Sequence, residues 1–166
     1  ETSAMPGLIR ALGALAVGWA ILVVAAPYLA MLPGVGGDYL SASAYAFGAA
    51  VCHQRPERSF HLAGAQLPVC ARCTGLYLSA ALGILFAWAR RPSSAAPFER
   101  WRTCLLWAAL PTVATLLFEW WRPSGVPGAF RALAAVPLGA AAGALLAGSV
   151  GFRSKLHRCE RTRHGR

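Results

Sequence analysis

Apolar residues in this chain are grouped in long blocks and do not alternate with polar residues as they would in a half-buried strand. Four blocks are long enough to cross roughly 30 Å of hydrocarbon, and they cover residues 8–32, 69–89, 101–121 and 130–150. A segment surrounded by lipid must satisfy its backbone polar groups internally, so each block is predicted to be a helix. The pattern therefore predicts an all-α fold, an integral membrane bundle of about four transmembrane helices that forms one domain over residues 1–151.

The composition supports lipid as the solvent of these blocks. Hydrophobic residues make up 57% of the chain and charged residues 13%, whereas roughly a quarter of the residues in a soluble domain are charged. So few charges cannot cover the water-facing surface of a soluble domain. The first block is longer than the apolar core of a signal peptide, and no clear cleavage site follows it, so it is predicted to be a retained span.

The basic residues predict the orientation of the chain in the cell membrane. They are concentrated in the loop at residues 90–102 and in a basic C-terminal tail at residues 152–166. By the positive-inside rule these two segments, and with them both termini, are cytoplasmic. The segment 33–68 is then extracytoplasmic, although it carries Arg55 and Arg58. Within it, the apolar stretch 39–51 is too short to span and is expected to lie in the interface or to re-enter the membrane.

The net charge of +10 also bears on partners. The basic residues lie between and after the apolar blocks, which indicates contact with anionic membrane lipid and not with a nucleic acid. The fourth block is rich in small residues, and Gly139 and Gly143 form a small-xxx-small pair that allows a neighbouring helix to approach closely. We expect that neighbour within the same bundle.

The candidate chemistry lies in the loop at residues 52–73, directly before the second span. This loop holds three of the five cysteines and two of the four histidines. Cysteine and histidine in a set of four suit tetrahedral zinc, and thiolate ligands favour zinc over magnesium or calcium. The predicted ligands are Cys52, His53, Cys70 and Cys73. His61 is the alternative to His53, because the side chains of adjacent residues such as Cys52 and His53 diverge.

Two other interpretations of the same cysteines stay open. Cys70 and Cys73 form a CxxC pair that is expected in the first turn of the second span, where a helix N-terminus and Arg72 would favour a thiolate. That arrangement is typical of a thiol-disulfide oxidoreductase coupled to a quinone, with Cys52 as a third thiol. In the other interpretation, a metal or disulfide only staples the loop to the second span, in an accessory subunit of a larger membrane complex.

Charged and amide side chains near the cysteines extend the predicted site. Gln54, Arg58 and Arg72 are predicted to support the metal ligands or to bind an anionic group, since arginine holds phosphate and carboxylate by paired hydrogen bonds. Glu119 lies near the outer end of the third span and Arg131 at the start of the fourth. An ionisable group at that depth needs a partner, so the two are predicted to pair within the membrane. The pair either locks two helices or joins the site.

The Cys/His segment resembles the DUF2085 family of multi-pass membrane proteins. The matching residues are Cys52-His53-Gln54, Pro56, Arg58-Ser59-Phe60, Gly64, Pro68-Val69-Cys70, Arg72-Cys73-Thr74-Gly75 and Tyr77. A looser second signature fits Pro111, Glu119, Arg131 and the small residues at 139–143. The resemblance implies a multi-pass membrane fold with one linked Cys/His/Arg site, and it implies no particular reaction.

Overall fold

The computed structural model describes residues 4–32, 34–90, 98–122 and 126–164. Its elements follow the order α1 (Ala4–Leu29), α2 (Val35–Val51), the short 3-10 helix η1 (Pro56–Arg58), β1 (Ser59–Leu62), β2 (Ala65–Cys70), α3 (Ala71–Arg90), α4 (Phe98–Trp121) and α5 (Gly128–His164). Helices α1, α3, α4 and α5 are each long and apolar enough to cross a membrane. The predicted bundle of about four transmembrane helices is therefore confirmed.

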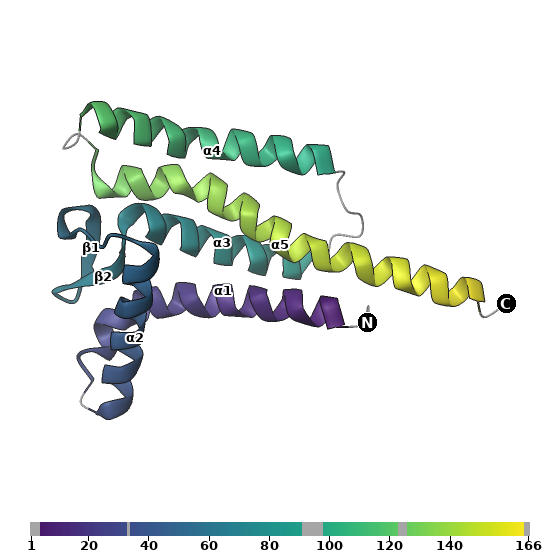
Figure 1. The fold of residues 1–166 in the computed structure, drawn as a ribbon, viewed down its shortest axis with the longest axis horizontal. Helices are drawn as coiled ribbons and strands as arrows, with labels where there is room; N and C mark the ends of the chain where they lie inside the picture. Colours follow the sequence, from purple (N-terminus) through teal and green to yellow (C-terminus); the bar gives the residue numbers. More distant parts are fainter. Residues whose placement is uncertain (1–3, 33, 91–97, 123–125, 165–166) are drawn as a thin grey trace.

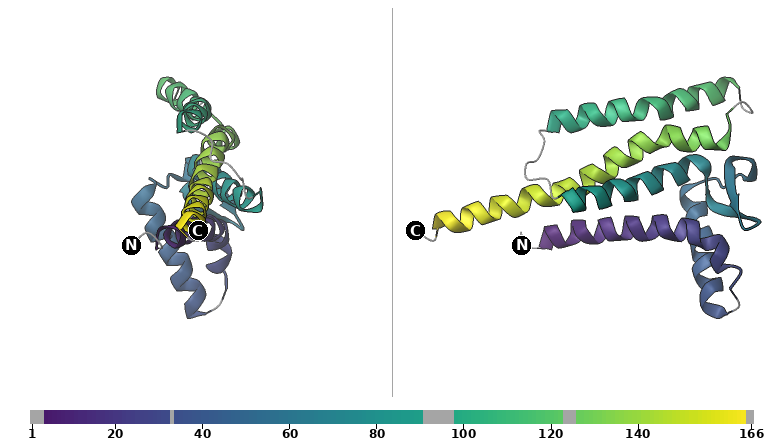
Figure 2. Two further views of the ribbon diagram at one scale, coloured as in Figure 1. Left: turned by 90° about the vertical axis from the view of Figure 1, so that its right-hand side faces the viewer. Right: turned by 180° about the vertical axis from the view of Figure 1, so that it is seen from behind.

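The four long helices run side by side along the long axis of the molecule, and both chain termini lie at the same end of the bundle (Figures 1 and 2). The opposite end carries α2, which crosses the direction of the long helices, together with the β1–β2 hairpin (Figure 1). The candidate chemistry is confined to this end, which we call the hairpin end of the bundle.

Close contact between α3 and α5 forms the centre of the bundle. A Cβ atom at Gly143 would overlap the backbone of Ala80, and one at Gly139 would overlap the backbone of Leu76. Only glycine lets the two helix backbones approach this closely. The neighbour expected for the small residues of the fourth span is thus α3 of the same chain.

Helix α2 contains the apolar stretch 39–51, which is too short to span and lies crosswise at the hairpin end (Figure 1). Its position leaves Tyr39, Leu40 and Phe47 exposed. Ser41 is buried and its hydroxyl donates to the carbonyl of Ala26 at 3.1 Å, which holds α2 against α1.

The hydrophobic pattern did not predict the β1–β2 hairpin. Strands β1 and β2 pair antiparallel, with His61 opposite Gln66 and Leu62 opposite Ala65. Ala63 and Gly64 connect them with φ angles of 51° and 78°, as in the tight turns that match the twist of a hairpin. Strands this short carry too few residues for a period of two to stand out.

Because of the hairpin, the second span begins after Cys70 and not before it. Cys70 was expected in the first turn of the second span, but it is the last residue of β2, and α3 begins at Ala71. At the other end of the chain, α5 continues beyond the predicted fourth span, so its backbone is helical through most of the predicted basic tail (Figure 2). The side chains of that tail lie outside the described residues.

Candidate metal centre

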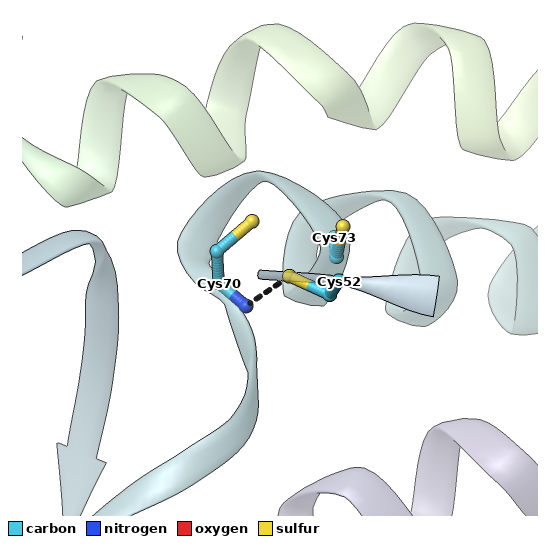
Figure 3. A group of neighbouring side chains, drawn as sticks. All are labelled: Cys52, Cys70 and Cys73. Carbon is cyan, nitrogen blue, oxygen red and sulfur yellow. Dashed lines mark hydrogen bonds between the residues drawn. The ribbon is translucent and has the colours of Figure 1, made fainter. Parts of the chain in front are cut away.

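Three cysteines from three different elements meet at the hairpin end (Figure 3). Cys52 follows the last residue of α2, Cys70 ends β2, and Cys73 lies in the first turn of α3. Their sulfur atoms all lie within 4.8 Å of one another, and all three are free thiols. A donor set separated by up to 21 residues of sequence is thus gathered in one place.

The sulfurs lie in an apolar setting. Cys52 and Cys70 are 8% and 6% exposed and pack with Val23 of α1 and with Val69. Trp19 and Tyr77 pack around this cluster. Water is largely excluded from two of the three sulfurs, those of Cys52 and Cys70.

Backbone and side-chain groups support negative charge on the sulfurs. The backbone N–H of Cys70 donates to the sulfur of Cys52 at 3.2 Å (Figure 3). A hydrogen bond from Cys73 lowers the pKa of the Cys70 thiol to about 5, although burial of Cys70 acts in the opposite direction. Cys73 lies at a helix N-terminus, whose unpaired N–H groups carry partial positive charge. The arrangement favours a thiolate at Cys70, the form in which cysteine binds a metal.

The two histidines that were candidates for a fourth ligand lie at the rim of the cysteine cluster. His53 is exposed, and its Nδ1 atom lies 3.7 Å from the sulfur of Cys52. It is not within the group of ligand atoms that all lie within 4.8 Å of one another. His61 is exposed on β1 and is likewise outside that group. The structure therefore brings together the three sulfurs and places His53 beside one of them.

Gln54 connects α2 to the hairpin. Its side-chain amide nitrogen donates to the backbone carbonyls of Tyr45 at 2.8 Å and Pro68 at 2.6 Å, and the backbone carbonyl of Gln54 accepts from the side-chain amide of Gln66 at 2.6 Å. Gln54 has a φ angle of 44°, a left-handed conformation that turns the chain sharply after Cys52. Both hydrogens of the amide are used in these bonds, so the side chain positions the backbone around Cys52 and Cys70.

Tyr45 and Gln66 belong to the same hydrogen-bond network as Gln54, and neither was predicted as a site residue. The hydroxyl of Tyr45 donates to the carbonyl of Gln66, and the amide of Gln66 also contacts the hydroxyl of Ser59 at 3.3 Å. Their role depends on the pairing of β1 with β2 and on the crossing of α2. No local pattern of residues marks such a role.

Glu119 lies in a second polar group at the hairpin end. Its carboxylate accepts from Arg131 Nε at 2.7 Å and from Arg72 Nη2 at 2.9 Å, and Arg58 Nη1 lies 3.7 Å from its other oxygen. Glu119 and Arg131 are buried. The structure thus brings Glu119 and Arg131 together, and it adds two arginines that come from η1 and α3.

The cysteines and the arginines share the first turn of α3 but contact different helices. The cysteine cluster packs on Val23 of α1, whereas Arg72 pairs with Glu119 of α4. The cysteines and the arginines predicted to form one linked site thus contact different helices, α1 and α4.

Comparison with known proteins places this end of the chain in a family. A family model described as "Predicted membrane protein (DUF2085)" matches residues 52–145. An uncharacterised protein of Methanocaldococcus jannaschii is 39% identical over 62 residues, 36% of this chain and 40% of that protein. An uncharacterised protein of Methanothermobacter thermautotrophicus is 51% identical over 37 residues, 22% of this chain and 33% of that protein. No solved structure matches the chain.

The family match begins at Cys52 and extends into α5, so it includes both polar groups described above. It covers more than half of the chain, and the chain spans less than half the length of the two archaeal relatives. The chain therefore belongs to the DUF2085 family of predicted membrane proteins.

Proposed function

We propose that this membrane protein binds one zinc ion through Cys52, Cys70 and Cys73, with His53 as the fourth ligand. The observation that supports this proposal is the convergence of three free sulfurs within 4.8 Å of one another. A zinc–sulfur bond of about 2.3 Å in tetrahedral geometry separates two sulfur ligands by roughly 3.8 Å. Small movements of the three side chains bring them to that separation.

The position of His53 suits the fourth coordination site. A sulfur and a nitrogen on one tetrahedral zinc lie roughly 3.6 Å apart, and His53 Nδ1 lies 3.7 Å from the sulfur of Cys52. Rotation of the exposed imidazole is required to reach the metal. With His53 bound, the site has four protein ligands and is structural. With His53 turned away, one position is open for water or a substrate.

Burial favours a metal over the alternative of a thiol oxidoreductase. Redox-active cysteines are partly exposed because a partner thiol or a quinone must reach them. Cys52 and Cys70 are 8% and 6% exposed. A zinc ion would also compensate for the negative charge of thiolates packed against apolar side chains, a setting in which unpaired charge is costly.

The proposed zinc ion would join parts of the chain that are far apart in sequence. It would hold the end of α2, the end of β2 and the start of α3 together, on the α1 side of α3. We assign this end to the extracytoplasmic face of the cell membrane, because α3 ends in the basic residue Arg90, and α4 carries Arg100 and Arg102 near its start, at the opposite end of the bundle (Figure 1).

The experiment is elemental analysis of the purified full-length chain combined with counting of reactive thiols before and after chelation. We expect about one zinc per chain and protection of Cys52, Cys70 and Cys73 until the chelator is added. Cys52→Ser removes the zinc, whereas Cys104→Ser, which changes an exposed cysteine of α4, retains it.

Two results would contradict the proposal. A chain without metal that contains a disulfide among Cys52, Cys70 and Cys73 would overturn the zinc proposal. Reoxidation of the reduced chain by added quinone would then distinguish a thiol oxidoreductase from a structural disulfide. Retention of stoichiometric zinc by the Cys52→Ser variant would place the metal elsewhere. Co-purification of other subunits in fixed ratio would assign the zinc a stapling role in a larger complex.

A further inference from the structure

Three arginines surround one carboxylate at the hairpin end of the bundle. Arg131, Arg72 and Arg58 lie 2.7, 2.9 and 3.7 Å from the oxygens of Glu119. Arginine stays protonated in proteins, so three positive charges face one negative charge and leave an excess of two. We propose that these residues, which we call the arginine cluster, bind an anionic phosphate group.

The excess charge is poorly hydrated. The side chains of Arg58, Arg72 and Arg131 are 24%, 19% and 7% exposed. Among the described residues, Glu119 is the carboxylate within ion-pair distance of them, and no second acidic group compensates the remaining charge. Charge held away from water is costly unless it is paired. A bound phosphate dianion would bring the group to neutrality, and the single charge of a phosphodiester headgroup would halve the excess.

Two helix N-termini add to the positive potential. Helix α3 begins at Ala71 and α5 at Gly128, and a Cβ atom at Gly128 would lie 3.6 Å from that of Ala71. Each N-terminus carries unpaired N–H groups and the positive end of a helix dipole. The arginine cluster is thus adjacent to two such ends, which further favours an anion.

Two of the guanidinium groups, those of Arg72 and Arg58, have N–H donors that are not used in hydrogen bonds to Glu119. Arg72 Nε is buried and has no hydrogen-bond partner, which is costly for a charged donor. Arg58 Nη1 lies 3.7 Å from Glu119, beyond hydrogen-bond distance. Both residues can therefore donate to a ligand without releasing Glu119. Phosphate oxygens accept several such bonds, and the planar guanidinium matches their geometry.

The depth of the arginine cluster indicates where the phosphate comes from. Trp120 and Trp121 directly follow Glu119 and are 85% and 84% exposed. Tryptophan is enriched at the membrane–water interface, the level at which lipid headgroups lie. A phosphate at this level is either part of a lipid headgroup or a free phosphate from the aqueous side. The two share one recognition chemistry.

This inference does not depend on the zinc proposal. Arg72 pairs with Glu119 of α4, while Cys52 and Cys70 pack with Val23 of α1. Phosphate binding should therefore survive chelation of the metal, provided that the chain stays folded.

The experiment uses the delipidated full-length chain in a neutral detergent, titrated separately with inorganic phosphate and with short-chain phosphatidylglycerol and followed by calorimetry. We expect Arg58→Gln to weaken binding by roughly tenfold or more, as loss of a hydrogen bond from a charged group does. Arg58→Lys keeps the positive charge but lacks the planar guanidinium that makes paired hydrogen bonds, so it should lower the affinity by less than Arg58→Gln does. Arg55→Gln changes an exposed arginine of the same loop and should leave affinity unchanged.

The outcomes separate the two sources. If the chain binds phosphatidylglycerol but not inorganic phosphate, the site is assigned to a lipid headgroup. If it binds inorganic phosphate but not phosphatidylglycerol, the site is assigned to free phosphate. The proposal is overturned if the folded wild-type chain binds neither probe. It is also overturned if Arg55→Gln weakens binding as much as Arg58→Gln, because the effect would then be general surface charge. Wild-type binding and the Arg58→Lys variant decide the matter even if Arg58→Gln does not fold.

Discussion

The backbone N–H of Cys70 donates to the sulfur of Cys52 at 3.2 Å, across 18 residues of sequence. This bond joins the end of α2 to the end of β2, directly before α3, and holds Cys52 beside Cys70 (Figure 3). The position of Cys52 therefore depends on the turn that follows it and on the hairpin that precedes α3.

The first prediction concerns the fourth ligand. His53→Ala should lower zinc affinity by at least about tenfold, since loss of even a supporting partner costs that much. His61→Ala is the matched control, because His61 is also exposed but lies on β1 outside the ligand group. Competition with a fluorescent chelator measures both, and X-ray absorption reports whether nitrogen leaves the zinc. If His61→Ala lowered the zinc affinity and His53→Ala did not, His61 would be the ligand.

The second prediction concerns the hydrogen bonds by which Gln54 connects α2 to the hairpin. Gln54→Asn tolerates the left-handed conformation at this position but is too short to reach the carbonyls of Tyr45 and Pro68. We expect a loss of about 1–3 kcal/mol in the free energy of unfolding and weaker zinc binding. Unfolding in mixed micelles measures the first and chelator competition the second. Unchanged values in both would show that Gln54 has no positioning role.

The third prediction concerns the hairpin turn. Ala63 has a φ angle of 51°, a region that costs an L-residue other than glycine roughly 1–2 kcal/mol, and Asn occupies it more readily. Ala63→Asn should therefore raise the free energy of unfolding by about 0.5–1 kcal/mol. Gly64→Ala, at a φ angle of 78°, should have the opposite sign. A loss of stability in Ala63→Asn would argue against this turn.

The fourth prediction concerns the contact between α3 and α5. Gly143→Ala should destabilise the bundle by about 1–3 kcal/mol, because its Cβ overlaps the backbone of Ala80 and the helices must separate. Gly148→Ala lies on the same helix with its nearest contact, Trp101, at 3.8 Å. It should be neutral or slightly stabilising, since Ala favours a helix. Equal effects of the two variants would exclude close packing at Gly143.

The fifth prediction concerns the carboxylate at the centre of the arginine cluster. Glu119→Gln removes the negative charge from among three arginines and should cost about 3–5 kcal/mol of stability, as breaking a buried ion pair does. Glu57→Gln changes an exposed carboxylate of η1 and should stay within about 0.5 kcal/mol of wild type. Unfolding of both variants in one detergent gives the comparison. A neutral Glu119→Gln would show that the arginines do not require it.

Local sequence was sufficient to predict the four spans and the pairing of Cys70 with Cys73, because each depends on interactions within a short segment. A run of apolar residues long enough to cross a membrane must be helical whatever surrounds it, so the four spans followed from composition and length. Cys70 and Cys73 lie three residues apart, and that spacing alone predicts sulfurs on one side of a turn. The hairpin was missed because β1 has only four residues, from Ser59 to Leu62.

The sequence by itself determined that the chain lies in lipid, that it has four spans, and that cysteine donors and arginines gather before the second of them. Only the tertiary structure decided that these residues form two groups, because the face of α3 that meets each neighbour depends on helix packing. Arg72 and Glu119 are 47 residues apart and meet through the positions of α3, α4 and α5. Gly139 and Gly143 set the approach of two of these helices, and no short stretch of sequence contains that relationship.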